Sequence, residues 1–202
     1  MLQEILIVTI SLFAIVDPIA AVPVFISTFG GADRKKRRKA AIDAVLAAFA
    51  LLVVFALIGM PLLNYLNISI SAFMIAGGLL LLFLAFEFLL GQLPKSRTVE
   101  SEPGDAVVPI GTPLLAGPGA ITSVIFFTHL YGFTITFVAT IIVMVICLAA
   151  FLMSHKLERV IGKNGLKIIT RIMGLITAAI AISFIEKAFI GYGILHAVAP
   201  MI

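Results

Sequence analysis

Long apolar stretches separated by short polar segments make up almost the whole sequence. A helix needs about 20 apolar residues to cross the roughly 30 Å hydrocarbon core of a bilayer. Charged residues cluster between the stretches, which indicates helices rather than the alternating strands of a membrane barrel. The pattern therefore predicts an all-α polytopic membrane protein with six transmembrane helices. The predicted spans lie at about 4–28, 41–63, 70–92, 107–128, 133–153 and 168–190.

The composition excludes several classes of protein. Of the 202 residues, 62% are hydrophobic and only 12% are charged, and the mean hydropathy is +1.23. A soluble domain of this size cannot bury so much apolar surface. The single Cys147 lies within an apolar run, so no disulfide framework is expected. The pI of about 9.4 is explained by membrane topology signals, and no nucleic-acid partner is expected.

Basic residues are distributed unevenly between the two sides of the predicted spans. Thirteen of the 14 Lys and Arg residues fall on one side, and only Lys187 falls on the other. Because Lys and Arg are enriched in cytoplasmic loops, this side is predicted to be the cytoplasm, with both termini outside. The basic run at 33–39 has an alternative interpretation, as a patch for lipid headgroups or a partner. The expected connecting segments are 30–39, 64–69, 93–106, 131–132 and 154–167.

Two proline-containing dipeptides interrupt apolar spans half a chain apart. Asp17-Pro18 lies within the first span, and Gly117-Pro118 lies within the fourth. Glycines near the start of the third and sixth spans favour close helix approach. Three spans per half reverse the direction of the second half, so we predict two inverted three-helix repeats with discontinuous first and fourth helices. Their expected boundaries are 1–92 and 107–202, joined by a cytoplasmic linker at 93–106.

The chemistry of the two breaks suggests a ligand. Deep in the membrane, no water pairs with the backbone groups that a break leaves free. Asp17 and Gly117 suit the N-cap of a new helix, and proline suits its first position. A helix start attracts a carboxylate, whereas the carbonyls that end the preceding helix attract an ammonium group or a small cation. Two facing breaks would therefore fit a small zwitterion. The candidate substrate-binding residues are Asp17, Pro18, Ile19, Ala20, Ala116, Gly117, Pro118, Gly119, Ala120, Thr122 and Ser123.

Asp17 is the residue whose placement in a membrane costs most, at least about 2.5–3.5 kcal/mol on insertion scales. It is expected to cap the second half-helix, to contact a substrate ammonium group or to carry a coupling proton, and these roles are compatible. For both breaks, the alternative is an ordinary proline kink that neighbouring helices repair. No HExxH or GxSxG motif is present, so no enzyme activity, catalytic residue or metal site is predicted.

Several short motifs are spread over nearly the whole chain. They are Asp17-Pro18-Ile19, Pro23-Val24-Phe25, the segment 31–38, Ala76-Gly77-Gly78, the segment 113–121 and Arg171–Leu175. With these motifs, and above all with Leu-Ala-Gly-Pro-Gly-Ala-Ile at 115–121, the sequence resembles the MarC/SnatA family. The resemblance implies a six-span inner-membrane protein that transports small neutral amino acids such as glycine and alanine. Many members of that family have Asn where this chain has Asp17.

The leading hypothesis is a secondary transporter of small neutral amino acids that works by alternating access of its two halves. No cofactor is expected, and coupling to H⁺ or to Na⁺ is left open. A passive small-solute channel is one alternative, because some channels also use two half-helices. A non-transporting membrane protein, such as one linked to antibiotic-resistance operons, is another.

Overall fold

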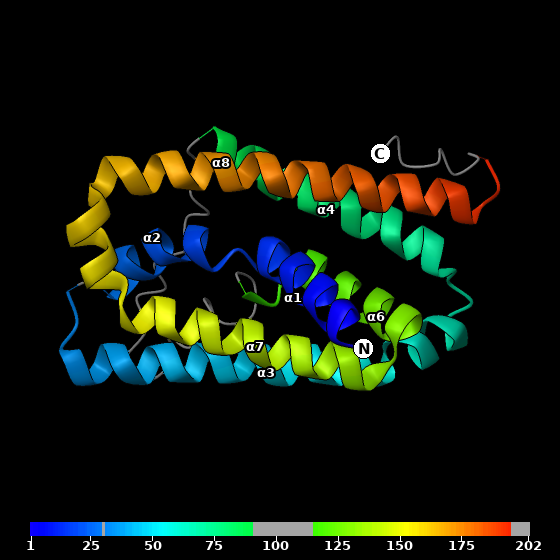
Figure 1. Cartoon of the computed structure of the whole chain (residues 1–202), viewed down its shortest axis with the longest axis horizontal. Coiled ribbons are helices and arrows are strands. Elements are labelled where there is room, and N and C mark those ends of the chain that lie inside the picture. The colour runs from blue at the N-terminus through cyan, green and yellow to red at the C-terminus, as the bar shows by residue number, and fades with distance from the viewer. Residues whose placement is uncertain (30, 91–114, 195–202) are drawn as a thin grey trace.

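The computed structural model of the chain describes residues 1–29, 31–90 and 115–194. In these ranges the regular secondary structure is entirely helical, and most helices run along the long axis of the molecule (Figure 1). The helices are α1 (Leu2–Val16), α2 (Pro18–Phe29), α3 (Arg34–Tyr65), α4 (Ile70–Leu89), α6 (Pro118–Tyr131), α7 (Phe133–Leu152) and α8 (Ser154–Gly191).

The short helices α1, α2 and α6 lie between two pairs of longer helices (Figure 1). On one side, α4 packs along α8 in the most extensive contact between the described helices, and on the other side α3 packs along α7. Between these pairs, α2 contacts α8 and α6 contacts α4, while α1 contacts α7 and α6 also contacts α3. The starts of α2 and α6 are therefore enclosed by longer helices on both sides.

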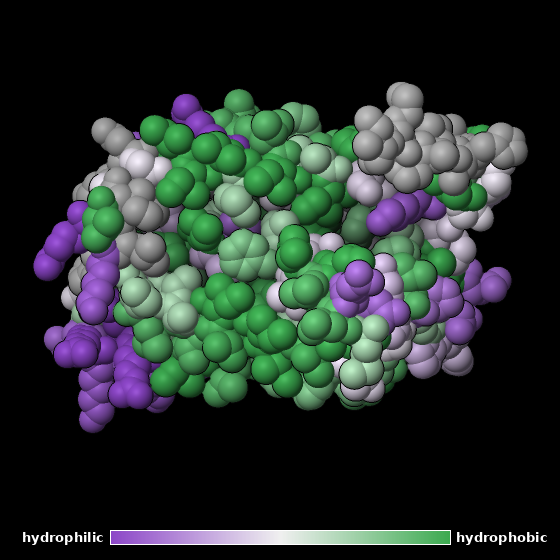
Figure 2. All heavy atoms as spheres, in the orientation of Figure 1, coloured by the Kyte–Doolittle hydropathy of each residue, from purple (hydrophilic) through white to green (hydrophobic). Residues whose placement is uncertain are grey.

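The outer surface is apolar along the middle of the molecule, and charged side chains gather at the end where α3 begins (Figure 2). Large apolar side chains such as Phe83 and Val145 are more than half exposed. An exposed apolar surface of this extent is typical of contact with lipid. Within the described residues, five segments are long and apolar enough to cross a membrane, which confirms a multi-pass membrane protein. They are Leu2–Ile26, Arg34–Tyr65, Ile70–Leu89, Phe133–Leu152 and Lys167–Gly191.

These five segments correspond to five of the six predicted spans. The remaining predicted span, 107–128, is described only from residue 115 onward, and its described part contains the start of α6. The predicted linker at 93–106 lies outside the described residues.

Two segments that we expected to be linkers are helical. Residues 34–39 form the beginning of α3, and the whole of 154–167 belongs to α8, with a non-helical conformation at Gly162. Arg and Lys are good helix formers, so both helices begin before their apolar segments. Within α8, Gly162 has a φ of 72°, which glycine adopts without strain, and the chain changes direction there. The part of α8 before Gly162 lies across the end of the molecule (Figure 1).

Candidate functional site

The first break separates α1 from α2 at Asp17. Asp17 has the left-handed conformation φ 47°, ψ 67°, which Asp tolerates better than most residues. Its Oδ1 accepts a hydrogen bond of 3.0 Å from the backbone N–H of Ala20, the third residue of α2. This is the geometry of a helix N-cap. The prediction that Asp17 opens a new helix is therefore confirmed.

A proline at position 18 also leaves a carbonyl of α1 without its usual donor. In an uninterrupted helix, the N–H of residue 18 would bond to the carbonyl of Ala14, but proline has no N–H. The hydroxyl of Thr177, from α8, donates to the carbonyl of Met173 at 2.9 Å and lies 3.5 Å from the Ala14 oxygen. Thr177 is fully buried, so α8 contributes a polar group to the first break. We did not predict this role, although a hydroxyl three residues after Gly174 in an apolar span was a usable signal.

The second oxygen of Asp17 has no hydrogen-bond partner among the described residues. Asp17 is only 3% exposed, and its Oδ2 is buried. A buried oxygen without a donor costs free energy, so this carboxylate has unused capacity to accept a proton or a ligand N–H.

The second break differs from the first because its helix has no side-chain cap. Gly117 stands at the N-cap of α6 with extended backbone, and Pro118 takes the first helical position, as predicted. The carbonyl of Gly117 accepts the first helical hydrogen bond, from the N–H of Ile121 at 3.0 Å. The N–H groups of Gly119 and Ala120 precede that bond and have no acceptor within the helix. They are donors suited to an anion.

A pocket of about 170 Å³ adjoins the start of α6. Because a water molecule takes up about 30 Å³ in the liquid, this volume is enough for several waters or one small solute. Ile15 of α1, two residues before Asp17, also lines the pocket, whereas Asp17 and Pro18 do not. The lining residues are Ile15, Leu80, Leu81, Phe83, Leu84, Leu115, Gly117, Pro118, Gly119 and Ala120.

The pocket brings together four of the predicted site residues, which are Gly117, Pro118, Gly119 and Ala120. The remaining seven are not among its lining residues. Two of these seven, Thr122 and Ser123, donate their hydroxyl hydrogen bonds within α6, to the carbonyls of Pro118 at 2.8 Å and Gly119 at 2.6 Å. These two hydroxyls are buried, and as donors they are already engaged. The other five are Asp17, Pro18, Ile19, Ala20 and Ala116, and of these only Ile19 is not buried.

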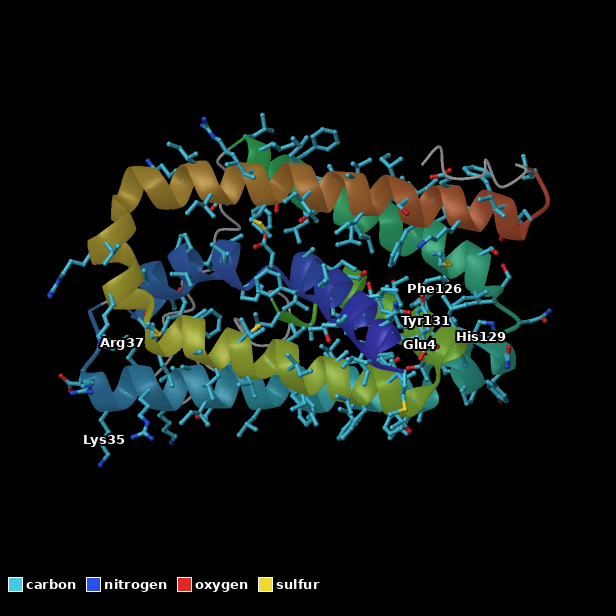
Figure 3. The ribbon with its side chains drawn as sticks, in the orientation of Figure 1. Glu4, Lys35, Arg37, Phe126, His129 and Tyr131 are labelled. Carbon is cyan, nitrogen blue, oxygen red and sulfur yellow. The ribbon has the colours of Figure 1, made fainter. Side chains whose placement is uncertain are left out.

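Charged side chains lie outside the lining of this pocket. Lys35 and Arg37 project at the end where α3 begins, and Glu4, His129 and Tyr131 lie toward the opposite end (Figure 3). Glu4 pairs with the N-terminal amino group at 2.7 Å. Neither basic nor acidic side chains are among the lining residues, so the pocket offers no counter-charge for a charged ligand side chain.

The described structure defines a helical multi-pass membrane protein with interrupted apolar segments beside a small pocket. Comparison with known proteins specifies the group further. Residues 2–192 match the model of the MarC family integral membrane proteins, and the chain belongs to this family.

Curated relatives of similar length come from bacteria and archaea. The chain is 36% identical to the UPF0056 membrane protein YhcE of Escherichia coli over 196 residues, which cover 90% of each protein. It is 34% identical to a UPF0056 membrane protein of Buchnera aphidicola over 184 residues, covering 88% of this chain and 87% of the relative. With UPF0056 membrane protein MJ1677 of Methanocaldococcus jannaschii, the identity is 35% over 200 residues, covering 94% and 98%. No solved structure matches the chain.

Proposed function

We propose that this protein is a secondary transporter of small neutral amino acids of the glycine and alanine class. The observation that carries the proposal is the pocket of about 170 Å³ at the uncapped start of α6. A substrate carboxylate would accept hydrogen bonds from the N–H groups of Gly119 and Ala120, which have no acceptor within α6. The apolar lining suits a small uncharged side chain.

The first break supplies the opposite charge in this proposal. The substrate ammonium group would approach the free Oδ2 of Asp17 or the last carbonyls of α1. Ile15 supports this assignment, because it lines the pocket and lies two residues before Asp17. The carboxyl group of Asp17 could also carry a coupling proton. The proposal needs no cofactor, catalytic step or nucleic acid, and it leaves Na⁺ as the alternative coupling ion.

Alternating access would arise from two inverted repeats. The helix directions in Figure 1 support this arrangement, because α2 and α6 point toward opposite ends of the molecule. The packing also supports it, because the two halves make corresponding contacts. Helix α2 of the first half contacts α8 of the second half, and α6 of the second half contacts α4 of the first half. We propose that the two halves, 1–92 and 107–202, rock against each other around the breaks and expose the pocket to each side in turn.

Transport can be tested directly with purified protein in proteoliposomes. We expect counterflow of labelled glycine, competed by alanine and not by lysine or glutamate, because no charged side chain lines the pocket. Varying pH and Na⁺ separately identifies the coupling ion. Absence of counterflow, together with permeation of water or glycerol above that of empty liposomes, would instead make the protein a passive channel.

The proposed orientation, with the basic end in the cytoplasm and both termini outside, leads to a separate prediction. Replacing the six basic residues at 34–39 with Gln should increase the fraction of molecules inserted in the opposite orientation. The reason is that Lys and Arg residues next to a span keep that end of it in the cytoplasm. The measurement is labelling of Gln3→Cys by an impermeant maleimide on intact cells, since the native Cys147 is buried. Unchanged labelling would contradict the topology role of 34–39. In the correctly oriented molecules, we expect the amino acids to compete with labelled glycine as they do in the unmodified protein.

A further inference from the structure

Leu81 of α4 packs against the start of α6, beside the pocket. It lines the pocket and is only 2% exposed. Its side chain occupies the space where a Cβ on Gly119 would stand, with Cδ1 at 2.9 Å from that position and Cγ and Cδ2 closer still. The contact is reciprocal, because the side chain of Thr122 fills the corresponding space over Gly77, with Cγ2 at 2.7 Å. Two matching contacts between α4 and α6, Leu81 with Gly119 and Thr122 with Gly77, therefore hold Leu81 against the backbone of Gly119.

The other α4 residues of the pocket wall are less confined. Leu80 is 50% exposed and Phe83 is 64% exposed, so both can turn toward the outer surface. Leu81 has no such freedom, since it is buried and rests on Gly119. A ligand that binds the N–H groups of Gly119 and Ala120 has its remaining atoms in the pocket, where Leu81 forms a fixed part of the wall.

We propose that Leu81 sets the upper size limit for the side chain of a substrate bound at the start of α6. This inference rests on the proposed function, because it concerns the substrate range of that same site. Shortening Leu81 would open space beside Gly119, and the pocket would then accept neutral amino acids with larger side chains. A hydrophobic pocket discriminates against one extra methylene by about 10–200-fold, so the change should be readily measured.

The test compares how well glycine, alanine and valine compete with labelled glycine in proteoliposomes. For the unmodified protein we expect valine to compete at least about tenfold more weakly than alanine. Leu81→Ala should bring valine to within about threefold of alanine, and Leu81→Val should lie between the two. The matched control is Leu79→Ala on the same helix, since Leu79 is 55% exposed and does not line the pocket. It should leave the ranking unchanged.

A second substitution at the contact separates substrate size from a general loosening of the protein. In the Leu81→Ala background, Gly119→Ala places a methyl group in the space that the leucine has left. The double variant should recover discrimination against valine. If Leu81→Ala and Leu81→Val both keep the original ranking while still transporting glycine, the inference is wrong. If the double variant behaves like Leu81→Ala, the inference is also wrong.

Failure of the proposed function gives a different result. In that case the unmodified protein neither binds nor transports glycine or alanine, and no ranking exists for the variants to change. Uptake by the unmodified protein with an unaltered ranking in the variants refutes only the role of Leu81. If Leu81→Ala does not fold, Leu81→Val still carries the test, because it removes much less volume from the contact.

Discussion

We expect Asp17→Leu to reduce uptake of labelled glycine about tenfold or more, because one hydrogen bond to a charged group contributes about 1.5–3 kcal/mol. Leucine cannot accept the hydrogen bond that Oδ1 receives from the N–H of Ala20. It also has no oxygen to receive a substrate ammonium group or a proton. The measurement is initial uptake in proteoliposomes, normalised to the amount of correctly folded protein.

The stability of this variant is expected to change little, since two effects oppose each other. Loss of the cap costs about 0.5–2 kcal/mol. Leucine in the left-handed conformation of Asp17 costs about 1–2 kcal/mol more. Removing a carboxylate from the membrane interior offsets these costs by about 2.5–3.5 kcal/mol. A large fall in uptake by a stable protein would therefore locate the defect at the break itself.

Asp17→Asn is the control that separates the cap from the charge. Asparagine tolerates the left-handed conformation and can accept the same hydrogen bond from Ala20, but it carries no negative charge. Full uptake by the Asn variant and loss by the Leu variant would assign the requirement to the cap. Loss of uptake in both stable variants would assign it to the carboxylate, and full uptake in both would exclude Asp17 from transport.

The breaks could be predicted from the sequence because their chemistry is local. Pro18 and Pro118 lack the N–H that a continuous helix needs, and Asp17 is a strong N-cap residue. The long apolar runs likewise predicted the spans that the structure describes. The glycines near the start of the third and sixth spans also predicted close helix approach. Gly78 and Gly174 lie where α4 and α8 touch.

Other features depend on which helices face each other, and a single sequence does not contain that information in a local pattern. Leu81 looks like one of many apolar residues in its span until α4 is placed against Gly119. Thr177 gained its role from the position of α8 beside α1. Hydropathy also failed to predict that 154–167 is largely helical, because a polar helix at the membrane surface and a polar loop have similar composition.

The second large effect is expected at the contact between α4 and α8. A Cβ on Gly78 would lie 2.9 Å from the carbonyl oxygen of Ala181 and 2.8 Å from Cγ1 of Ile185. On the opposite helix, a Cβ on Gly174 would lie 3.1 Å from the carbonyl oxygen of Ala85. Carbon atoms in contact normally stay about 3.5–4.0 Å apart, and the two carbonyls belong to helix backbone that cannot turn aside. The two glycines therefore allow these helices to approach closely.

Gly78→Leu should accordingly lower the stability of the detergent-solubilised protein by about 1–3 kcal/mol or more, the range found when side chains are forced into packed interiors. Thermal unfolding measures the loss, and Ala76→Leu is the matched control, because Ala76 lies on the same helix with its side chain exposed. Gly78 does not line the pocket, so the molecules that remain folded should keep their affinity for glycine. Equal stability of the two leucine variants would contradict the close contact. A selective loss of glycine affinity without loss of stability would mean that α4 and α8 act on the pocket and not only on each other.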